Sequence, residues 1–113
     1  MLWNIKRKIK FFGQRLTKGW NDSETWDLDI TIAKFIVPRL KRFRELNNGF
    51  PNGFTMETWG QTIDHMVESF EMIIQEKTND NFIEPDIEKA KQRFNRRQEG
   101  LILFGKYFHD LWW

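Results

Sequence analysis

The sequence predicts an all-α protein, a compact antiparallel bundle of three long helices preceded by a basic amphipathic helix. Apolar residues recur at spacings of three and four along most of the 113 residues, and no segment alternates as a strand does. Short segments rich in Gly, Asn and Pro separate the helical stretches. The 11 Phe and 6 Trp residues supply bulky side chains to fill the space between helices.

The first predicted helix covers residues 1–18 and is basic and amphipathic. Its apolar stripe is formed by Leu2, Ile5, Ile9, Phe12 and Leu16, and Gly19 is expected to end it. Residues 1–21 contain no acid and six bases, namely Lys6, Arg7, Lys8, Lys10, Arg15 and Lys18. Either the stripe packs on the bundle, or the helix binds a nucleic acid, an acidic protein groove or an anionic membrane surface.

The second predicted helix starts with a capping box between Asn21 and Glu24. Acidic residues near its start and basic residues near its end complement the helix dipole. Pro38 lies inside the apolar pattern, lacks an N–H group and clashes with the carbonyl of Lys34. We therefore expect a kink or a break near residues 34–38.

The remaining helices follow two predicted turns. Gly, Pro and Asn make residues 47–53 a loop, after which Thr55 is expected to cap the third helix. A second turn is predicted at residues 78–81, and Pro85 fits the first position of a long helix that runs to the C-terminus. The periodicity predicts that the following residues are mostly buried: Trp26, Val37, Leu40, Trp59, Ile63, Phe70, Phe94, Leu101, Phe104 and Phe108.

The length supports a single domain over residues 1–113, with the bundle at residues 21–112. The absence of Cys excludes disulfides, cysteine nucleophiles and thiolate metal sites, and it is compatible with a reducing cytosol. Neither a transmembrane span nor a cleavable secretory signal is visible in the sequence.

The net charge of +2 conceals blocks of opposite sign. Residues 34–44 contain five bases and no acid, residues 57–88 contain nine acids and one base, and residues 89–97 contain five bases and no acid. Neighbouring helices could neutralise one another, or the blocks could present basic and acidic faces to partners.

No catalytic, cofactor or metal site is predicted. The two His residues, His65 and His109, are not preceded by the Glu of a Glu-x-x-His pair, because Thr62 and Lys106 occupy those positions. No glycine-rich phosphate loop or nucleophile motif is present either. His65 is expected on the outer, solvated side of its helix.

The candidate partner-binding residues are therefore basic or aromatic. Two Trp residues at the C-terminus are favoured as interface anchors, although they could instead tuck under the loop at residues 47–54. The candidates are Lys6, Arg7, Lys8, Lys10, Arg15, Arg39, Lys41, Arg42, Arg44, Trp112 and Trp113.

Several short motifs are distinctive, namely Thr31-Ile32-Ala33-Lys34-Phe35, Pro38-Arg39-Leu40, Gly49-Phe50-Pro51 and Leu103-Phe104-Gly105-Lys106-Tyr107-Phe108. They resemble a family of small uncharacterised bacteriophage and prophage proteins. Trp20, Trp26, Trp59 and Leu111-Trp112 extend the resemblance over residues 20–112. The family implies no activity, cofactor or catalytic residue.

The resemblance implies a phage protein acting by binding in the cytoplasm of a host bacterium. The leading hypothesis is a stoichiometric inhibitor of a host nucleic-acid-guided defence nuclease, of the anti-CRISPR kind, and its partner would be the nuclease or its guide complex. RNA or DNA could be contacted through the basic faces. The alternatives are a virion, packaging or nucleic-acid-associated accessory protein, and a membrane-surface protein anchored by residues 1–18.

Overall fold

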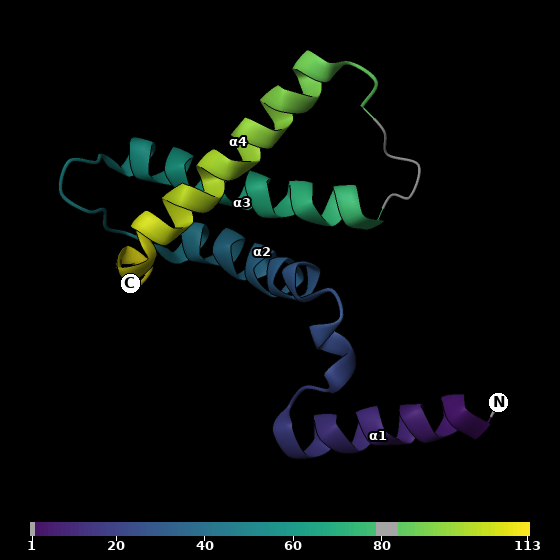
Figure 1. Cartoon of the computed structure of the whole chain (residues 1–113). Helices are drawn as coiled ribbons and strands as arrows, with labels where there is room; N and C mark the ends of the chain where they lie inside the picture. Colours follow the sequence, from purple (N-terminus) through teal and green to yellow (C-terminus); the bar gives the residue numbers. More distant parts are fainter. Residues whose placement is uncertain (1, 79–83) are drawn as a thin grey trace. The chain divides into compact units, whose positions relative to one another are not determined.

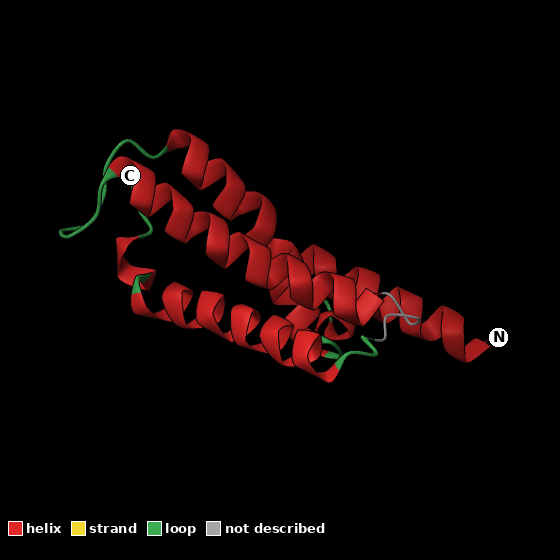
Figure 2. Cartoon of the chain, turned by 90° about the horizontal axis from the view of Figure 1, so that it is seen from above, coloured by secondary structure: helices red, strands yellow, loops and turns green. Residues whose placement is uncertain are grey.

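The computed structural model describes residues 2–78 and 84–113, with the side chains of residues 2 and 3 left out. Every regular element in these ranges is a helix, which confirms the all-α class (Figures 1 and 2). The elements are α1 (Leu2–Lys18), the 3-10 turn η1 (Asp22–Thr25), α2 (Leu28–Leu46), α3 (Met56–Thr78), α4 (Ile87–Lys106) and the 3-10 turn η2 (Phe108–Asp110). None of them is long and apolar enough to cross a lipid bilayer.

The chain divides into two compact units, Met1–Thr31 and Ile32–Trp113, and the boundary falls inside α2. Unit 1 consists of α1, η1 and the first residues of α2. Unit 2 contains the rest of α2 together with α3, α4 and η2. The six bases and four acids of unit 1 leave it a formal charge of +2, whereas unit 2 carries twelve of each and is neutral.

The ends of α1 and α2 follow the predicted local signals with one difference. Gly19 ends α1 with a φ of 81°, a conformation that glycine adopts without a steric penalty. The capping box between Asn21 and Glu24 is confirmed, but it caps the N-terminus of η1 and not that of α2, which begins only at Leu28. Helix α2 then continues through Pro38 as one element, so the break considered from the sequence does not occur.

Helices α3 and α4 are capped by side chains. Thr55 Oγ1 accepts the Thr58 N–H at 3.1 Å, and Thr58 Oγ1 accepts the Thr55 N–H at 2.8 Å, which confirms the predicted cap. The N-cap of α4 is Asp86, whose Oδ1 accepts the Glu88 N–H at 2.9 Å, so the position predicted for Pro85 is wrong. The predicted turn at residues 78–81 lies outside the described residues beyond Thr78, which ends α3.

The core of unit 2 lies between α2 and α3 and is covered on one side by α4. Its buried members are Ala33, Val37, Leu40, Trp59, Ile63, Met66, Val67 and Phe70. Leu101 and Phe104 of α4 pack against them and are half-buried. Figure 1 shows α4 crossing obliquely over α3, so one stretch of α4 contacts the core and the rest extends past it.

Three residues predicted to be buried are exposed. Trp26 follows η1, outside the register of α2, and is 60 % exposed. Phe94 lies in the first half of α4, before the crossing with α3 at Gly100, and is 50 % exposed. Phe108 belongs to η2, where the chain leaves the α-helical register, and is 55 % exposed.

Candidate partner-binding surfaces

Helix α1 uses its polar side to pack on the segment that follows it. The Phe11 ring meets the Trp26 ring edge to face with centroids 5.4 Å apart, and the guanidinium of Arg7 lies 4.8 Å from the centroid of the Trp26 ring. Lys10 Nζ is 3.2 Å from Asp22 Oδ2, and Gln14 Oε1 accepts the Asp22 N–H at 2.7 Å. These contacts are all internal to unit 1.

The opposite side of α1 is an exposed apolar stripe. Ile5, Ile9, Phe12 and Leu16 are between 53 % and 71 % exposed, so unit 1 by itself does not cover them. The predicted stripe also includes Leu2, whose side chain is not described. We call the four exposed residues the α1 stripe.

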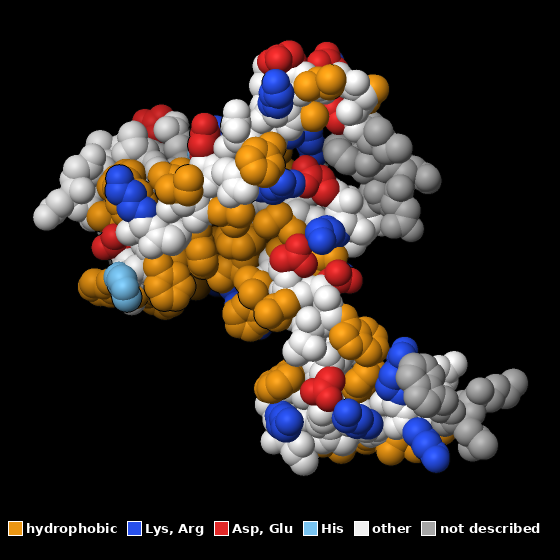
Figure 3. Space-filling model, viewed as in Figure 1, with side chains coloured by type: hydrophobic (Ala, Val, Ile, Leu, Met, Phe, Trp, Pro, Cys, Tyr) orange, Lys and Arg blue, Asp and Glu red, His pale blue; other side chains and the backbone are white. Residues whose placement is uncertain are grey.

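Basic residues border the α1 stripe on both sides. Each residue turns the helix by about 100°, which places Lys6 along one edge and Lys8 and Arg15 along the other. Arg15 Nη1 lies 3.8 Å from Glu24 Oε1, and Lys10 is paired with Asp22. Lys6 and Lys8 form no ion pair with a residue that the structure describes. Figure 3 shows basic side chains gathered over α1 with apolar side chains beside them.

The predicted basic patch on α2 is mostly neutralised inside unit 2. Lys41 Nζ lies 2.7 Å from Glu71 Oε1, and Arg44 is paired with Asp64 and donates to the Gly60 carbonyl at 3.2 Å. Arg42 is paired with Glu45 one turn later at 2.8 Å. Arg39 donates to the carbonyl of Phe35 at 2.8 Å, and its guanidinium lies 3.7 Å from the centroid of that ring.

The acidic stretch of α3 also neutralises α4. Arg96 donates two hydrogen bonds to Glu68 Oε2, at 3.0 and 3.2 Å. Arg97 is paired with Glu76, and Arg93 Nη2 lies 3.6 Å from the other oxygen of the same carboxylate. Carboxylates of α3 therefore form ion pairs with basic residues of both α2 and α4. This agrees with the interpretation that neighbouring helices neutralise one another.

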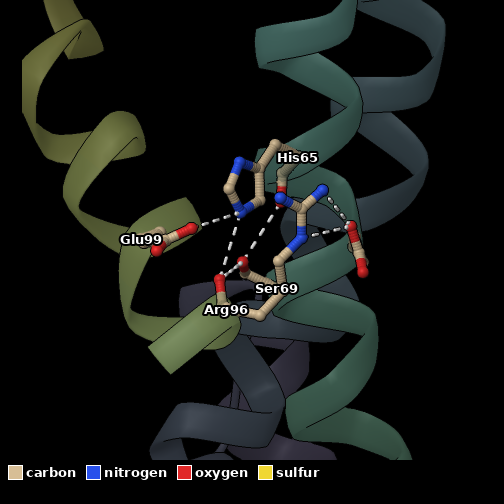
Figure 4. Close-up of polar contacts among 5 residues, drawn as sticks. His65, Ser69, Arg96 and Glu99 are labelled. Atoms are coloured by element: carbon tan, nitrogen blue, oxygen red, sulfur yellow. Dashed lines mark hydrogen bonds and ion pairs between the residues drawn. The ribbon is translucent and has the colours of Figure 1, made fainter. Parts of the chain in front are cut away.

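His65 is not the solvated residue that the sequence analysis expects. Its side chain is only 12 % exposed, because α4 crosses α3 at this point. Its Nε2 lies 3.1 Å from the Arg96 carbonyl oxygen and 3.8 Å from Glu99 Oε2 (Figure 4). The Ser69 hydroxyl bonds to the His65 carbonyl within α3 at 3.1 Å and also lies 3.4 Å from the Arg96 carbonyl oxygen, so His65 and Ser69 both contact the same carbonyl of α4. In the described parts of the chain, no three His, Asp or Glu side chains are grouped to hold a metal ion.

The C-terminal Trp pair borders a hollow beside the loop after α2. Trp112 and Trp113 line it together with residues 47–51. The two Trp residues therefore lie beside the predicted loop. Both remain largely exposed, at 74 % and 68 %. Asp110 also lines the hollow and was missed by the sequence analysis. No periodic signal could have found it, because it lies in η2, beyond the end of α4.

No family model, curated protein or solved structure matches this chain. The phage family therefore stays a prediction that rests on the residues quoted for it, and the inhibitory activity stays a prediction drawn from that resemblance.

Proposed function

We propose that this chain is a small phage-type binding protein that inhibits a host nucleic-acid-guided defence nuclease by occupying it, with α1 as the docking element. The observation that carries the docking proposal is the exposed α1 stripe bordered by basic residues on both edges. An amphipathic helix of this kind binds an apolar groove through residues spaced three and four apart. The flanking cations favour a groove with an acidic rim.

The internal ion pairs of unit 2 support α1 over the other basic stretches as the docking element. Lys41, Arg42, Arg44, Arg96 and Arg97 each face a carboxylate of unit 2, so binding a phosphate would require them to exchange that partner. In α1, Lys6 and Lys8 have no such carboxylate among the described residues. Unit 1 also carries a formal charge of +2 whereas unit 2 is neutral, so an anionic partner is attracted more strongly to unit 1.

The nuclease as the partner is supported by the resemblance to phage proteins. Small phage proteins commonly act by binding host proteins, and a basic docking element suits an effector surface that is acidic or that carries a guide nucleic acid. A protein can bind a nuclease without blocking its cleavage of nucleic acid. The experiment must therefore measure inhibition as well as binding.

The test is the double charge reversal Lys6→Glu with Lys8→Glu, which keeps the α1 stripe and the Arg7 and Phe11 side chains that contact Trp26. The matched control is Lys34→Glu with Lys89→Glu, two exposed lysines of unit 2 that form no ion pair with the described residues. We expect the parent and the control to co-purify with the host effector and to block its cleavage of target nucleic acid. The α1 variant should lose both properties.

Three other outcomes would contradict the proposal, and each indicates a different alternative. Recovery of portal or capsid proteins with the parent, without inhibition of cleavage, would indicate the virion or packaging alternative. Binding that requires anionic lipid would indicate a membrane-surface protein instead. Full inhibition by the α1 reversal variant would exclude the basic edges of the α1 stripe as the docking element.

A further inference from the structure

A hollow of about 260 Å³ in unit 2 is lined by four aromatic residues together with Asn47, Asn48, Gly49, Pro51 and Asp110. Phe50 and Pro51 line it from the loop after α2, and Trp112 and Trp113 line it from the segment after η2. Trp59 of α3 lines it from the core and is only 1 % exposed. Four rings from three separate parts of the chain therefore border one small space.

One wall of this hollow is fixed and the others are left open to solvent. The Trp59 ring packs edge to face against Phe54, with centroids 5.2 Å apart, and against Tyr107, at 5.8 Å. Trp112 and Trp113 instead leave most of their surface in water. Exposed tryptophan faces are unfavourable in water and are typical of surfaces that receive a ligand or a partner.

The charge of the hollow comes from a single carboxylate. Asp110 is the only ionisable side chain among the residues that line it. Its N–H donates to the Tyr107 carbonyl at 2.9 Å, which holds the residue in η2. The half-buried carboxylate forms no ion pair with any residue that the structure describes. A carboxylate beside aromatic faces creates a negative potential, since the faces of these rings are also negative.

We propose that this hollow binds an organic cation, namely the head group of an alkylated ammonium. Aromatic faces attract such cations, and rings surrounding a quaternary ammonium are an established way to recognise it. The volume lies below the roughly 300–1,000 Å³ of sites for drug-sized ligands, so it suits one head group. The same chemistry occurs in free choline and in the methylated lysine of a partner protein. This site is separate from the docking element proposed for α1.

The test compares choline with the neutral alcohol in which a tert-butyl group replaces the trimethylammonium head. The two probes have nearly the same shape and differ in charge. Titration followed by the NMR signals of the Trp indole N–H groups should show choline binding to the parent at least about tenfold more tightly than the alcohol. Asp110→Asn and Trp112→Ala should each weaken choline binding by about tenfold, whereas Asp27→Asn and Trp20→Ala, in unit 1, should not change it.

A second arm distinguishes the sources of the cation. A peptide with trimethyl-lysine that binds more tightly than choline would indicate a partner protein, and tighter binding of choline would indicate a free small molecule. Either result supports the cation site. Equal binding of the neutral alcohol, unchanged binding to folded Asp110→Asn, or no indole shift up to about 10 mM choline would overturn the proposal.

Discussion

Gly100 of α4 lies directly against Ser69 of α3, which is fully buried. A Cβ atom built on Gly100 would overlap the Ser69 side chain and would lie 2.7 Å from the His65 carbonyl oxygen. The absence of a side chain therefore lets the two helix backbones approach closely at the crossing. The Ser69 hydroxyl also lies 3.4 Å from the Arg96 carbonyl oxygen of α4, so a polar contact and a small residue occur together at this crossing.

The first prediction is that Gly100→Ala destabilises the protein, even though Ala favours helix formation. The added methyl group forces α4 away from α3, and overpacking of this kind costs about 1–3 kcal/mol. Chemical denaturation should show a lower free energy of unfolding. Gly105→Ala is the matched control, because nothing lies within 4 Å of its Cβ position. It should be neutral or stabilising by up to about 1 kcal/mol, and equal behaviour of the two variants would contradict the close approach.

The second prediction is that Phe70→Ala lowers the free energy of unfolding by about 3–5 kcal/mol. The Phe70 side chain is buried in the core of unit 2 and packs edge to face on Phe104 with centroids 5.1 Å apart. The matched control is Phe94→Ala in α4, whose side chain is half exposed. Thermal or chemical denaturation should show a much smaller loss for the control, and a comparable loss would mean that the core is misplaced.

The third prediction concerns the carboxylate that Arg93 and Arg97 share. Glu76 and Arg97 are about one-fifth exposed, so Glu76→Gln removes the negative charge that faces the partly buried Arg97 guanidinium. We expect a loss of about 1–3 kcal/mol, between the values for exposed and fully buried pairs. Glu45→Gln, which removes the exposed partner of Arg42, should cost less than about 0.5 kcal/mol. Denaturation curves that rank the two variants in the opposite order would contradict the self-neutralising arrangement.

The fourth prediction is a pH dependence of unit 1. A hydrogen bond with the Gln14 side chain, followed by the contact with Lys10, lowers the pKa of Asp22 below its usual value of 3.8. A lowered pKa in the folded state contributes stability above pH 3.8, and this contribution is lost as the pH falls through the folded value. NMR titration of the Asp22 carboxyl should show the lowered midpoint.

The same titration should move the indole signal of Trp26, which packs on α1 beside this pair. Asp22→Asn should abolish the component of the Trp26 shift that follows Asp22, whereas Asp27→Asn should preserve it. A Trp26 signal that ignores the titration of Asp22 would show that the ion pair does not support the packing of α1.

Local sequence signals determined most of the helical boundaries. The capping box at Asn21, the cap at Thr55 and the glycine that ends α1 depend on residues within a few positions of one another. Such interactions can be read along the chain because their geometry is local. Pro85 was misassigned because Asp86, one position later, supplies a better N-cap oxygen.

The periodicity of each helix identified an apolar side but could not tell whether that side is covered. In α3 the apolar side is buried as predicted, whereas in α1 the equivalent stripe is exposed and the polar side packs on Trp26. Phe94 and Phe108 fit the helical pattern and still lie in solvent, because an oblique crossing buries one stretch of α4. The amphipathic pattern is a property of one helix, but burial requires a second surface.

The sequence by itself determined the all-α class, the positions of the loops and the alternation of basic and acidic blocks. The tertiary structure alone decided that Arg44 pairs with Asp64 and Arg96 with Glu68, and that His65 is covered by α4. It also brought Asp110 beside the loop at residues 47–51. The physical reason is range: caps and helical repeats act over a few residues, whereas these contacts join side chains up to about sixty positions apart and depend on where the helices cross.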